Sequence, residues 1–376
     1  MRVEQVSSIR RVDETEWRNL EPPDFPFFDH EFLLALERSR SVGRRTGWSP
    51  VYLICRDGEH VVGAMPLYLR TDSYGEYVFD WAWANAYHEH GLPYYPKLVS
   101  AVPFTPATGP KLLLRPGVDV AAVRGALMDG IEIVAEEFGV SSSHALFLPE
   151  RELDAFEDRG FAIRHSLQFH WRNRGYDAFP DYLDAMTSKR RRQVARERRQ
   201  LEGVEIERLT GDALCPEHAA LMYGFYVDTY DRKWGNPYLT RSFFEEVFHT
   251  MRDRTMLAIA RDELTRRPVA GSLFFYKDEA LFGRYWGAIK DVRNLHFELC
   301  YYQGIEFAVG RKMGLFEAGA QGEHKLARGF LPAVMYSAHD IRHPAFRRAI
   351  EHYIAEEREM ISYELDEYMQ HDPYKE

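Results

Sequence analysis

Hydrophobic and polar positions change their period several times between residues 268 and 330, and each change predicts a new element. Residues 269–276 and 280–288 are strand-like runs joined by a short polar turn, and a helical spacing follows from about 295 to 312. A third short strand is predicted over 315–318, before a loop dense in polar and charged side chains. Polar groups gathered at the ends of strands and a helix are typical of the site of an α/β enzyme.

The pattern divides the rest of the chain into two α/β halves, and we place the boundary at Asn173-Arg174-Gly175. The predicted domains are residues 1–174 and 175–376. In the first half, helices are expected near Asp29 and over 118–138 and 150–159, and strands over 50–56, 61–70, 77–83, 143–148 and 161–171. In the second half, helices are expected over 179–186, 189–202, 215–230, 240–251 and 344–369, and a strand over 255–261.

Composition limits the class of protein. The 376 residues are 45% hydrophobic and 14% aromatic, enough for two buried cores. The three cysteines have no metal-like spacing, which fits a reducing cytoplasm. No apolar run approaches the roughly 20 residues that span a bilayer, so we expect a cytoplasmic protein without a membrane span. The pattern does not decide an oligomeric state.

One helix is strongly basic although the net charge of the chain is −10. It includes Lys189, Arg190, Arg191 and Arg192, and Ser188 is its expected N-cap. A charge run of this kind is commonly a solvated helix face. Concentrated at a helix start, however, it also favours phosphate or RNA, so a tRNA is a possible partner.

His88 and His90 flank Glu89 in a segment expected to be extended, where residues two apart share a face. That spacing permits metal chelation, but the sequence offers no third ligand nearby, and we predict no metal site.

Particular strings across the chain resemble a known family. They are YYPKL, VPFTP, HWRN, SKRRRQVARERR, DRKWGNPYLT, GRYWG, LHFELCYYQGIEFA and FEAGAQGEHKLARGFLP. With these strings the chain resembles the FemAB-like family of N-acyltransferases, whose bacterial members are often labelled peptidoglycan biosynthesis or recognition proteins. The resemblance covers the chain from about residue 20 onward.

The resemblance implies an α/β fold of two tandem GNAT-like domains, each a mixed, mostly antiparallel sheet flanked by helices. It also implies transfer of an acyl or aminoacyl group onto a small-molecule amine. No tightly bound cofactor is expected, and acyl-CoA or aminoacyl-tRNA is the possible co-substrate. The chain departs from the usual GNAT pattern because the segment 290–294 has no glycine with which to wrap a pyrophosphate, although Lys290 and Arg293 could hold a phosphate electrostatically.

Amide formation needs a base, donors for an oxyanion and two substrates held together. The candidate catalytic residues are Glu317, His324, Lys325, Gln321 and His296. The candidate substrate-binding residues are Arg328, Arg284, Tyr285, Trp286, Glu298, Tyr301, Trp234 and Lys233, and the candidate phosphate-binding residues are Lys189, Arg190, Arg191, Arg192 and Arg293. Backbone N–H groups around Trp286 are further candidate oxyanion donors.

Two of these side chains have a structural alternative. Glu298, like Glu306, is as well explained by a hydrogen bond that holds its helix to a neighbouring element. Cys300 is expected to be inert packing, because nothing around it promises a lowered thiol pKa.

Three functions therefore remain open. The first is an acyltransferase that joins an activated acyl or aminoacyl donor to an amine, and the second is a Fem-type peptidyltransferase that uses aminoacyl-tRNA. The third is a tandem-GNAT protein that binds a ligand without catalysis, which the missing glycines of the phosphate loop favour.

Overall fold

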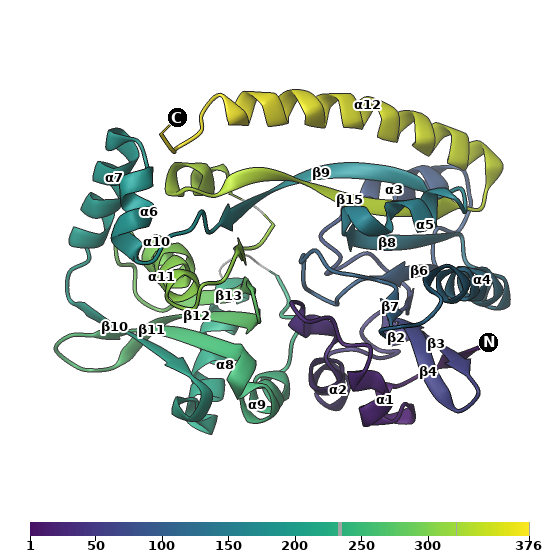
Figure 1. The fold of residues 1–376 in the computed structure, drawn as a ribbon, viewed down its shortest axis with the longest axis horizontal. Helices are drawn as coiled ribbons and strands as arrows, with labels where there is room; N and C mark the ends of the chain where they lie inside the picture. The colour runs from purple at the N-terminus through teal and green to yellow at the C-terminus, as the bar shows by residue number, and fades with distance from the viewer. Residues whose placement is uncertain (232–234, 321, 376) are drawn as a thin grey trace. The chain divides into compact units, whose positions relative to one another are not determined.

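The computed structural model describes residues 1–231, 235–320 and 322–375, without the side chain of Asp231 (Figure 1). The chain forms two compact units. Unit 1 consists of Met1–Pro22, Phe27–Leu167 and Val334–Glu364, and unit 2 consists of Pro23–Pro26, Gln168–Ala333 and Leu365–Glu376. Each unit therefore takes segments from distant parts of the sequence.

Unit 1 contains two sets of paired strands. The first is the antiparallel order β1-β3-β4-β7, formed by Arg2–Val6, Tyr52–Asp57, His60–Met65 and Leu113–Leu114. The second runs in the order β2-β5-β6-β8-β15, formed by Trp48–Pro50, Tyr68–Arg70, Lys97–Ser100, Ser142–Leu148 and the part of Leu331–Ile341 that lies in this unit. Only the β6–β8 pairing of this second set is parallel.

The helices of unit 1 are α1 (Glu14–Arg18), α2 (His30–Arg38), α3 (Trp81–Glu89), α4 (Val120–Phe138), α5 (Leu153–Glu157) and most of α12 (Pro344–Met369). Helix α4 packs on β1, β3 and β4 through the predicted apolar stripe, of which Val123, Leu127, Ile131 and Val134 are buried. Asp119 caps this helix by accepting a hydrogen bond from the Ala122 N–H, and Gly139 ends it in the left-handed conformation.

Unit 2 is built on the strand order β10-β11-β12-β13-β14-β9. These strands are Val204–Thr210, Thr255–Asp262, Pro268–Lys277, Ala280–Ala288, Leu315–Glu317 and the unit 2 part of Ala162–Arg172. All neighbours are antiparallel except β13 and β14, which run parallel. The strands of the central hairpin, β12 and β13, were both predicted from the sequence.

The helices of unit 2 are α6 (Phe179–Ala185), α7 (Ser188–Arg199), α8 (Pro216–Asp231), α9 (Arg241–Thr250), α10 (Leu295–Phe297) and α11 (Gln303–Gly310). A π-helical segment, Glu298–Tyr302, joins α10 to α11, so the predicted helix over 295–312 is present but locally widened. The core packs aromatic and aliphatic side chains of the sheet, such as Trp171 and Phe274, against Tyr302 and Ile305 of this helical stretch.

Four local predictions were wrong. Residues 77–83 are not a strand, because α3 begins at Trp81. His88 and His90 consequently lie at the end of a helix, where residues two apart point in different directions. The predicted strand 61–70 is divided into β4 and β5, and the N-cap of α7 is Thr187 rather than Ser188.

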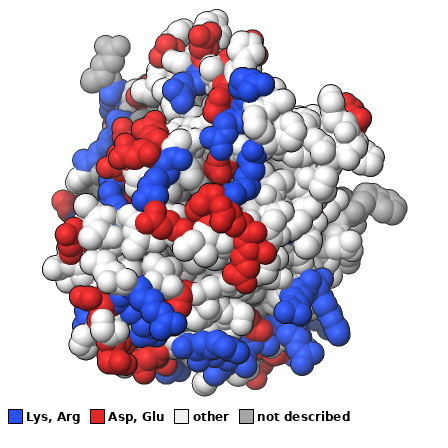
Figure 2. Space-filling view, turned by 90° about the vertical axis from the view of Figure 1, so that its right-hand side faces the viewer, with Lys and Arg blue, Asp and Glu red and all other residues white. Residues whose placement is uncertain are grey.

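Among the described residues, no helix is both long enough and apolar enough to cross a membrane. Charged side chains of both signs are mixed on the face drawn in Figure 2.

Candidate active site

A pocket of about 420 Å³ opens in unit 2 where β13 loses its neighbour β14. The parallel pairing ends at Phe282 and Glu317, but β13 continues to Ala288. Past Phe282, the edge of β13 that pairs with β14 has no partner strand among the described residues. The pocket is lined by Ser272, Gly283, Arg284, Tyr285, Trp286, His296, Cys300, Tyr301, Ala318, Gly319, Ala320, Gly322 and His324.

A β-bulge lies at the same point of β13. Leu273 pairs with Tyr285 and Phe274 pairs with Gly283, so Arg284 is an extra residue on this strand. A bulge bends its strand and redirects side chains, and bulges are common beside active sites. Here the bulge coincides with the end of the β13–β14 pairing, and both features help to open the sheet along 283–286.

The opposite wall of the pocket comes from the widened helical stretch. The π-helical segment contributes Cys300 and Tyr301, and α10 contributes His296. Single π-helical turns inside α-helices occur frequently at functional sites, because the extra residue shifts the side chains that follow it.

A hydrogen bond of 2.8 Å joins the Tyr301 hydroxyl to Nε2 of His324 inside this pocket. His324 comes from the 3₁₀ helix η7 (Glu323–Arg328), which follows the loop after β14. Burial lowers the pKa of His324, and the nearby charges of Arg328 and Lys325 lower it further. His324 is therefore neutral near pH 7 and able to accept a proton.

Aromatic rings enclose this pair. The His296 ring lies 5.2 Å from Trp286 and 5.4 Å from Tyr301, measured between ring centroids. Such edge-to-face contacts fix ring orientations, and the aromatic faces favour a bound cation or a planar group.

Lys325 lies behind the pocket wall and is almost completely buried. Its ammonium group donates a 2.6 Å hydrogen bond to the carbonyl of Gly319, which lines the pocket. Burial lowers the pKa of Lys325 to about 8. Its observed contact is with the loop that shapes the pocket.

Glu317 ends β14 and is also buried, but it does not line the pocket. Its carboxylate oxygen Oε1 lies 3.9 Å from Nε2 of His170. Burial lowers the pKa of His170 to about 3, so this imidazole is neutral and the contact is not an ion pair at pH 7.

Two arginine–glutamate pairs, one buried and one partly buried, hold α7 to the site. Arg328 makes a bidentate contact with Glu197, at 2.8 and 3.1 Å, and also donates to the His324 carbonyl. Arg198 makes a bidentate contact with Glu298, at 2.9 and 3.0 Å. Such bidentate pairs fix geometry, so these residues position η7 and the π-helical segment.

The outer face of α7 carries cations with no acidic partner among the described residues. Lys189, Arg192, Arg196 and Arg199 are exposed, whereas Arg191 pairs with Asp184 and Arg190 donates to Gln193. This face is therefore available to an anion.

The comparisons with known proteins agree with this architecture. The family model FemAB-like, described as peptidoglycan biosynthesis/recognition, matches residues 8–376. The chain belongs to the FemAB-like family. The predicted family and the predicted fold class, α/β with two tandem GNAT-like units, are thereby confirmed.

Solved structures share the fold of this FemAB-like chain at low sequence identity. A crystal structure of FemX has a TM-score of 0.56 at 10% identity, over 93% of this chain and 100% of that chain. L-PGS from Bacillus licheniformis has a TM-score of 0.50 at 9% identity, over 85% and 95%. The C-terminal domain (DUF2156) of an Agrobacterium fabrum protein has a TM-score of 0.54 at 9% identity, over 92% and 97%. A comparison with curated proteins found no match.

The family and the fold together support a transferase. Of the residues predicted for its site, the FemAB-like pocket brings together Arg284, Tyr285, Trp286, His296, Tyr301 and His324. It does not include Glu317, Lys325, Arg328 or Glu298, which lie behind or beside it. Gln321, Lys233 and Trp234 lie outside the described residues.

The predicted phosphate-binding residues of the FemAB-like chain do not line the pocket. Lys189, Arg190, Arg191 and Arg192 lie on α7, and Arg293 is exposed in the segment before α10. Sequence reasoning missed Ser272, on β12, and the role of Glu197. The apolar run around Ser272 predicted only a strand, and nothing in the basic helix separated Glu197 from a solvated carboxylate.

Proposed function

We propose that this protein is an N-acyltransferase that forms an amide between an activated acyl or aminoacyl donor and a small-molecule amine. The observation that carries the proposal is the Tyr301–His324 hydrogen bond in a pocket beside the part of β13 that extends past its pairing with β14. This arrangement offers a proton acceptor beside a strand edge, which are the two elements that acyl transfer to an amine requires.

The proposed reaction uses these groups in order. The amine nitrogen attacks the donor carbonyl, and the new C–N bond leaves negative charge on the carbonyl oxygen. Backbone N–H groups of 284–286 stabilise that oxyanion. The proton released by the amine passes to His324, directly or through the Tyr301 hydroxyl. The intermediate then breaks its bond to the donor's oxygen or sulfur, which takes that proton back from His324 and leaves as the alcohol or thiol.

The remaining pocket residues position the substrates. Trp286 and His296 form an aromatic wall against which the acceptor packs, and Arg284 supplies a cationic group at the bulge. Lys325 acts as a positioning residue through Gly319 rather than as the base, since its ammonium group is engaged behind the wall.

A direct test is transfer activity with acetyl-CoA or aminoacyl-tRNA and a panel of amines, with the product detected by mass spectrometry. The changes His324→Asn and Tyr301→Phe are expected to lower turnover, the first by roughly 10²–10⁴-fold, which is the usual contribution of a positioned base. His249→Asn, on an exposed position of α9, is the control and should not change turnover. Full activity of His324→Asn would refute the assignment.

A second candidate is the Fem-type use of aminoacyl-tRNA, which two observations favour. The exposed cations of α7 have no acidic partners among the described residues. In the usual GNAT pattern a pyrophosphate binds at the start of the helical stretch, near Leu295. In this chain, residues there bond to other parts of the protein instead. Asn294 has a left-handed conformation and donates to the Glu197 carbonyl, and Lys290 is paired with Asp262 at 2.7 Å.

The salt dependence of tRNA binding separates the two donors. If α7 binds the tRNA backbone, Lys189→Ala together with Arg192→Ala should weaken binding. The slope of log K against log salt should also become shallower, by about one for each phosphate that is no longer neutralised. Arg241→Ala, an exposed arginine paired with Glu245 on α9, is the control. Stabilisation of the protein by acetyl-CoA without tRNA binding would instead favour an acyl-CoA donor.

A further inference from the structure

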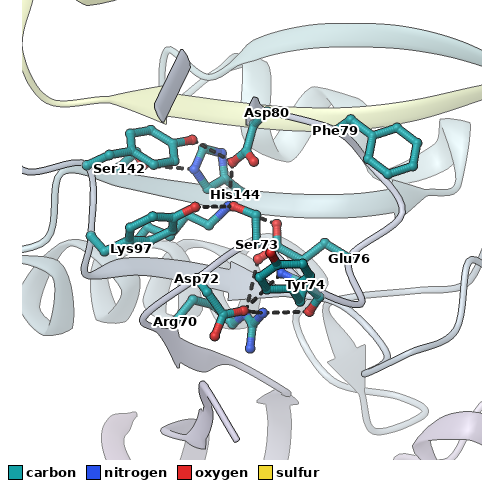
Figure 3. Close-up of polar contacts among 12 residues, drawn as sticks. Arg70, Asp72, Ser73, Tyr74, Glu76, Phe79, Asp80, Lys97, Ser142 and His144 are labelled. Carbon is teal, nitrogen blue, oxygen red and sulfur yellow. Dashed lines mark hydrogen bonds and ion pairs between the residues drawn. The ribbon is translucent and has the colours of Figure 1, made fainter. Parts of the chain in front are cut away.

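Unit 1 holds a buried polar cluster beneath the loop 71–81, which follows β5 and ends at Trp81, the first residue of α3 (Figure 3). Lys97 is fully buried, and its ammonium group donates to Ser73 and Glu76 at 2.8 Å and also to Asp80. Burial lowers the pKa of Lys97, but Glu76 and Asp80 outweigh that effect and raise it, so the lysine is charged.

Two arginines fasten the same loop. Arg70 is fully buried and donates to Glu76, to Asp72 and to the Tyr74 carbonyl, at 3.0, 2.9 and 2.8 Å. Arg164 donates to the Phe79 carbonyl at 2.8 Å. Together with Lys97, which bonds side chains of the loop, these cations anchor the loop to the strands beneath it.

The apolar side chains of this loop point outward. Tyr74 is 59% exposed, Phe79 is 57% exposed and Trp81 is 38% exposed. The rings of Tyr74 and Trp81 lie 5.1 Å apart, and Figure 3 shows Phe79 directed away from the polar contacts. The loop thus has inverted polarity, with carboxylates inside and aromatic rings outside.

Single exposed hydrophobic residues are ordinary, but three exposed aromatic residues on one anchored loop are not. A mobile loop could turn these side chains back onto the protein surface. Anchoring of the loop backbone opposes that movement. An arrangement of this kind is favourable when the rings have an apolar partner.

A basic turn adjoins the aromatic loop. Trp48 donates to the Tyr74 carbonyl, and Arg70 also donates to the Gly47 carbonyl, so the turn 43–47 packs against the loop. This turn carries Arg44 and Arg45, which are exposed and have no acidic partner among the described residues. The charge beside the rings is therefore positive, although the chain as a whole is acidic.

The chemistry of this surface favours a lipid bilayer over a sugar or a peptide groove. Tyr and Trp are suited to the boundary between headgroups and acyl chains, and arginine is attracted to anionic headgroups. Phe79 has no polar group to bond a sugar, and the 60° tilt between the Tyr74 and Trp81 rings prevents a flat stacking platform.

We propose that the loop 71–81 inserts its aromatic residues into the interface of an anionic bilayer, with Arg44 and Arg45 contacting the headgroups. The attachment is peripheral and reversible, because three rings and two cations give far less buried apolar area than a membrane-spanning helix. It is independent of the proposed transferase activity.

Co-sedimentation of the full chain with vesicles tests the proposal. Vesicles of phosphatidylcholine containing a quarter phosphatidylglycerol should bind the protein, and vesicles of phosphatidylcholine alone should bind it several-fold less. Tyr74→Ser, Phe79→Ser and Trp81→Ser should each lower the partition coefficient by about tenfold, given the cost of exposing a large apolar side chain. Arg44→Ala with Arg45→Ala should remove the preference for the anionic lipid.

The controls are Leu264→Ser and Tyr363→Ser, which remove exposed hydrophobic side chains elsewhere and should leave binding unchanged. An unchanged melting temperature shows that each loop variant is folded, and Phe79→Ser is the single change least connected to the polar cluster. The proposal fails if the wild-type protein does not bind anionic vesicles, or if the loop variants bind as well as the controls do.

Discussion

At the residue scale, two buried lysines have pKa values shifted in opposite directions, and each shift has a consequence for stability. Lys325 and Lys97 are both fully or almost fully buried, but their surroundings differ. Lys325 has one carbonyl as its hydrogen-bond acceptor, and burial lowers its pKa. Lys97 has two carboxylates, which raise its pKa. The two lysines should therefore respond in opposite ways to pH and to substitution.

The pKa of Lys325 predicts a change of stability at alkaline pH. Its pKa is about 8 in the folded protein and 10.5 ordinarily, so between these values the unfolded chain binds a proton that the folded chain does not. The contribution of Lys325 to the free energy of unfolding therefore rises as pH rises from about 8 to 10.5. Lys325→Met should lack this rise, so its stability relative to wild type falls over that range in urea unfolding. A constant difference between the two proteins would contradict the prediction.

Replacement of Lys97 should be strongly destabilising. Lys97→Met leaves Glu76 and Asp80 buried without their common cation, and removal of one partner from a buried ion pair costs about 3–5 kcal/mol. Urea unfolding of the full chain measures the decrease in stability. The combined change Lys97→Met, Glu76→Gln and Asp80→Asn should recover part of it, because both carboxylates left without Lys97 are neutralised and Arg70 keeps Asp72 as its acidic partner. Equal decreases in the single and combined variants would show that packing, not charge, dominates.

At the scale of elements, the contact between β13 and α8 depends on Gly287. A Cβ atom at this position would collide with the carbonyl oxygen of Phe225 in α8. The Trp286 carbonyl accepts a 2.9 Å hydrogen bond from Thr229 on the same helix, so the strand and helix are held close. This close packing supports the strand that forms one wall of the pocket.

Gly287→Ala should consequently lower the free energy of unfolding by about 1–3 kcal/mol, the usual cost of overpacking, and should distort the pocket at Trp286. Gly224→Ala is the matched control on α8, since its Cβ would have no neighbour within 4 Å. That control should be neutral or stabilising by up to about 1 kcal/mol, because glycine is unfavourable inside a helix. Thermal or urea unfolding distinguishes the two variants.

The sequence predicted helices and strands correctly where elements that pack together also follow one another along the chain. The hairpin of β12 and β13, the helical stretch after it and β14 lie within about fifty residues, and hydrophobic periodicity located them all. Tyr301 lies in this stretch and His324 follows β14 by seven residues, so both were found as candidate site residues from the sequence. The β-bulge and the π-helical segment were not, because each depends on one extra residue that changes no periodicity.

Long-range pairs were beyond the sequence. Glu197 and Arg328 are 131 residues apart, and Arg198 and Glu298 are 100 residues apart. A single sequence gives no sign that two charged residues at such separations meet, so the basic helix was interpreted only as a solvated face or as a phosphate or RNA site. Strands β10 and β15 were also missed, since β10 has no fully buried face to mark it.

At the scale of the whole molecule, each unit is assembled from three separate segments of the chain. Strand β8 of unit 1 pairs with β15, and Trp83 and Tyr87 share a buried cluster with Ile350 and Ile354 of α12. The predicted domain boundary between residues 174 and 175 stays a prediction. The assembly of unit 1 from separate segments can be tested with a fragment of the chain.

A fragment of residues 1–174 should not unfold cooperatively, because it lacks the β15 and α12 residues that complete unit 1. Circular dichroism during heating checks this. The control joins residues 1–167 through a flexible linker to 334–364, and this chain should regain a cooperative transition. A sharp transition in the 1–174 fragment alone would show that the later segments are dispensable.

The shared use of late segments also bears on how the chain folds as it is made. Domains commonly fold in order from the N-terminus during translation. Here unit 1 needs residues 334–364, and unit 2 needs residues beyond them, where Tyr374 donates to the Gly329 carbonyl. Neither unit can complete its contacts while only the first 333 residues exist. Nascent chains of this protein should therefore depend more on chaperones than those of proteins whose domains are continuous in sequence.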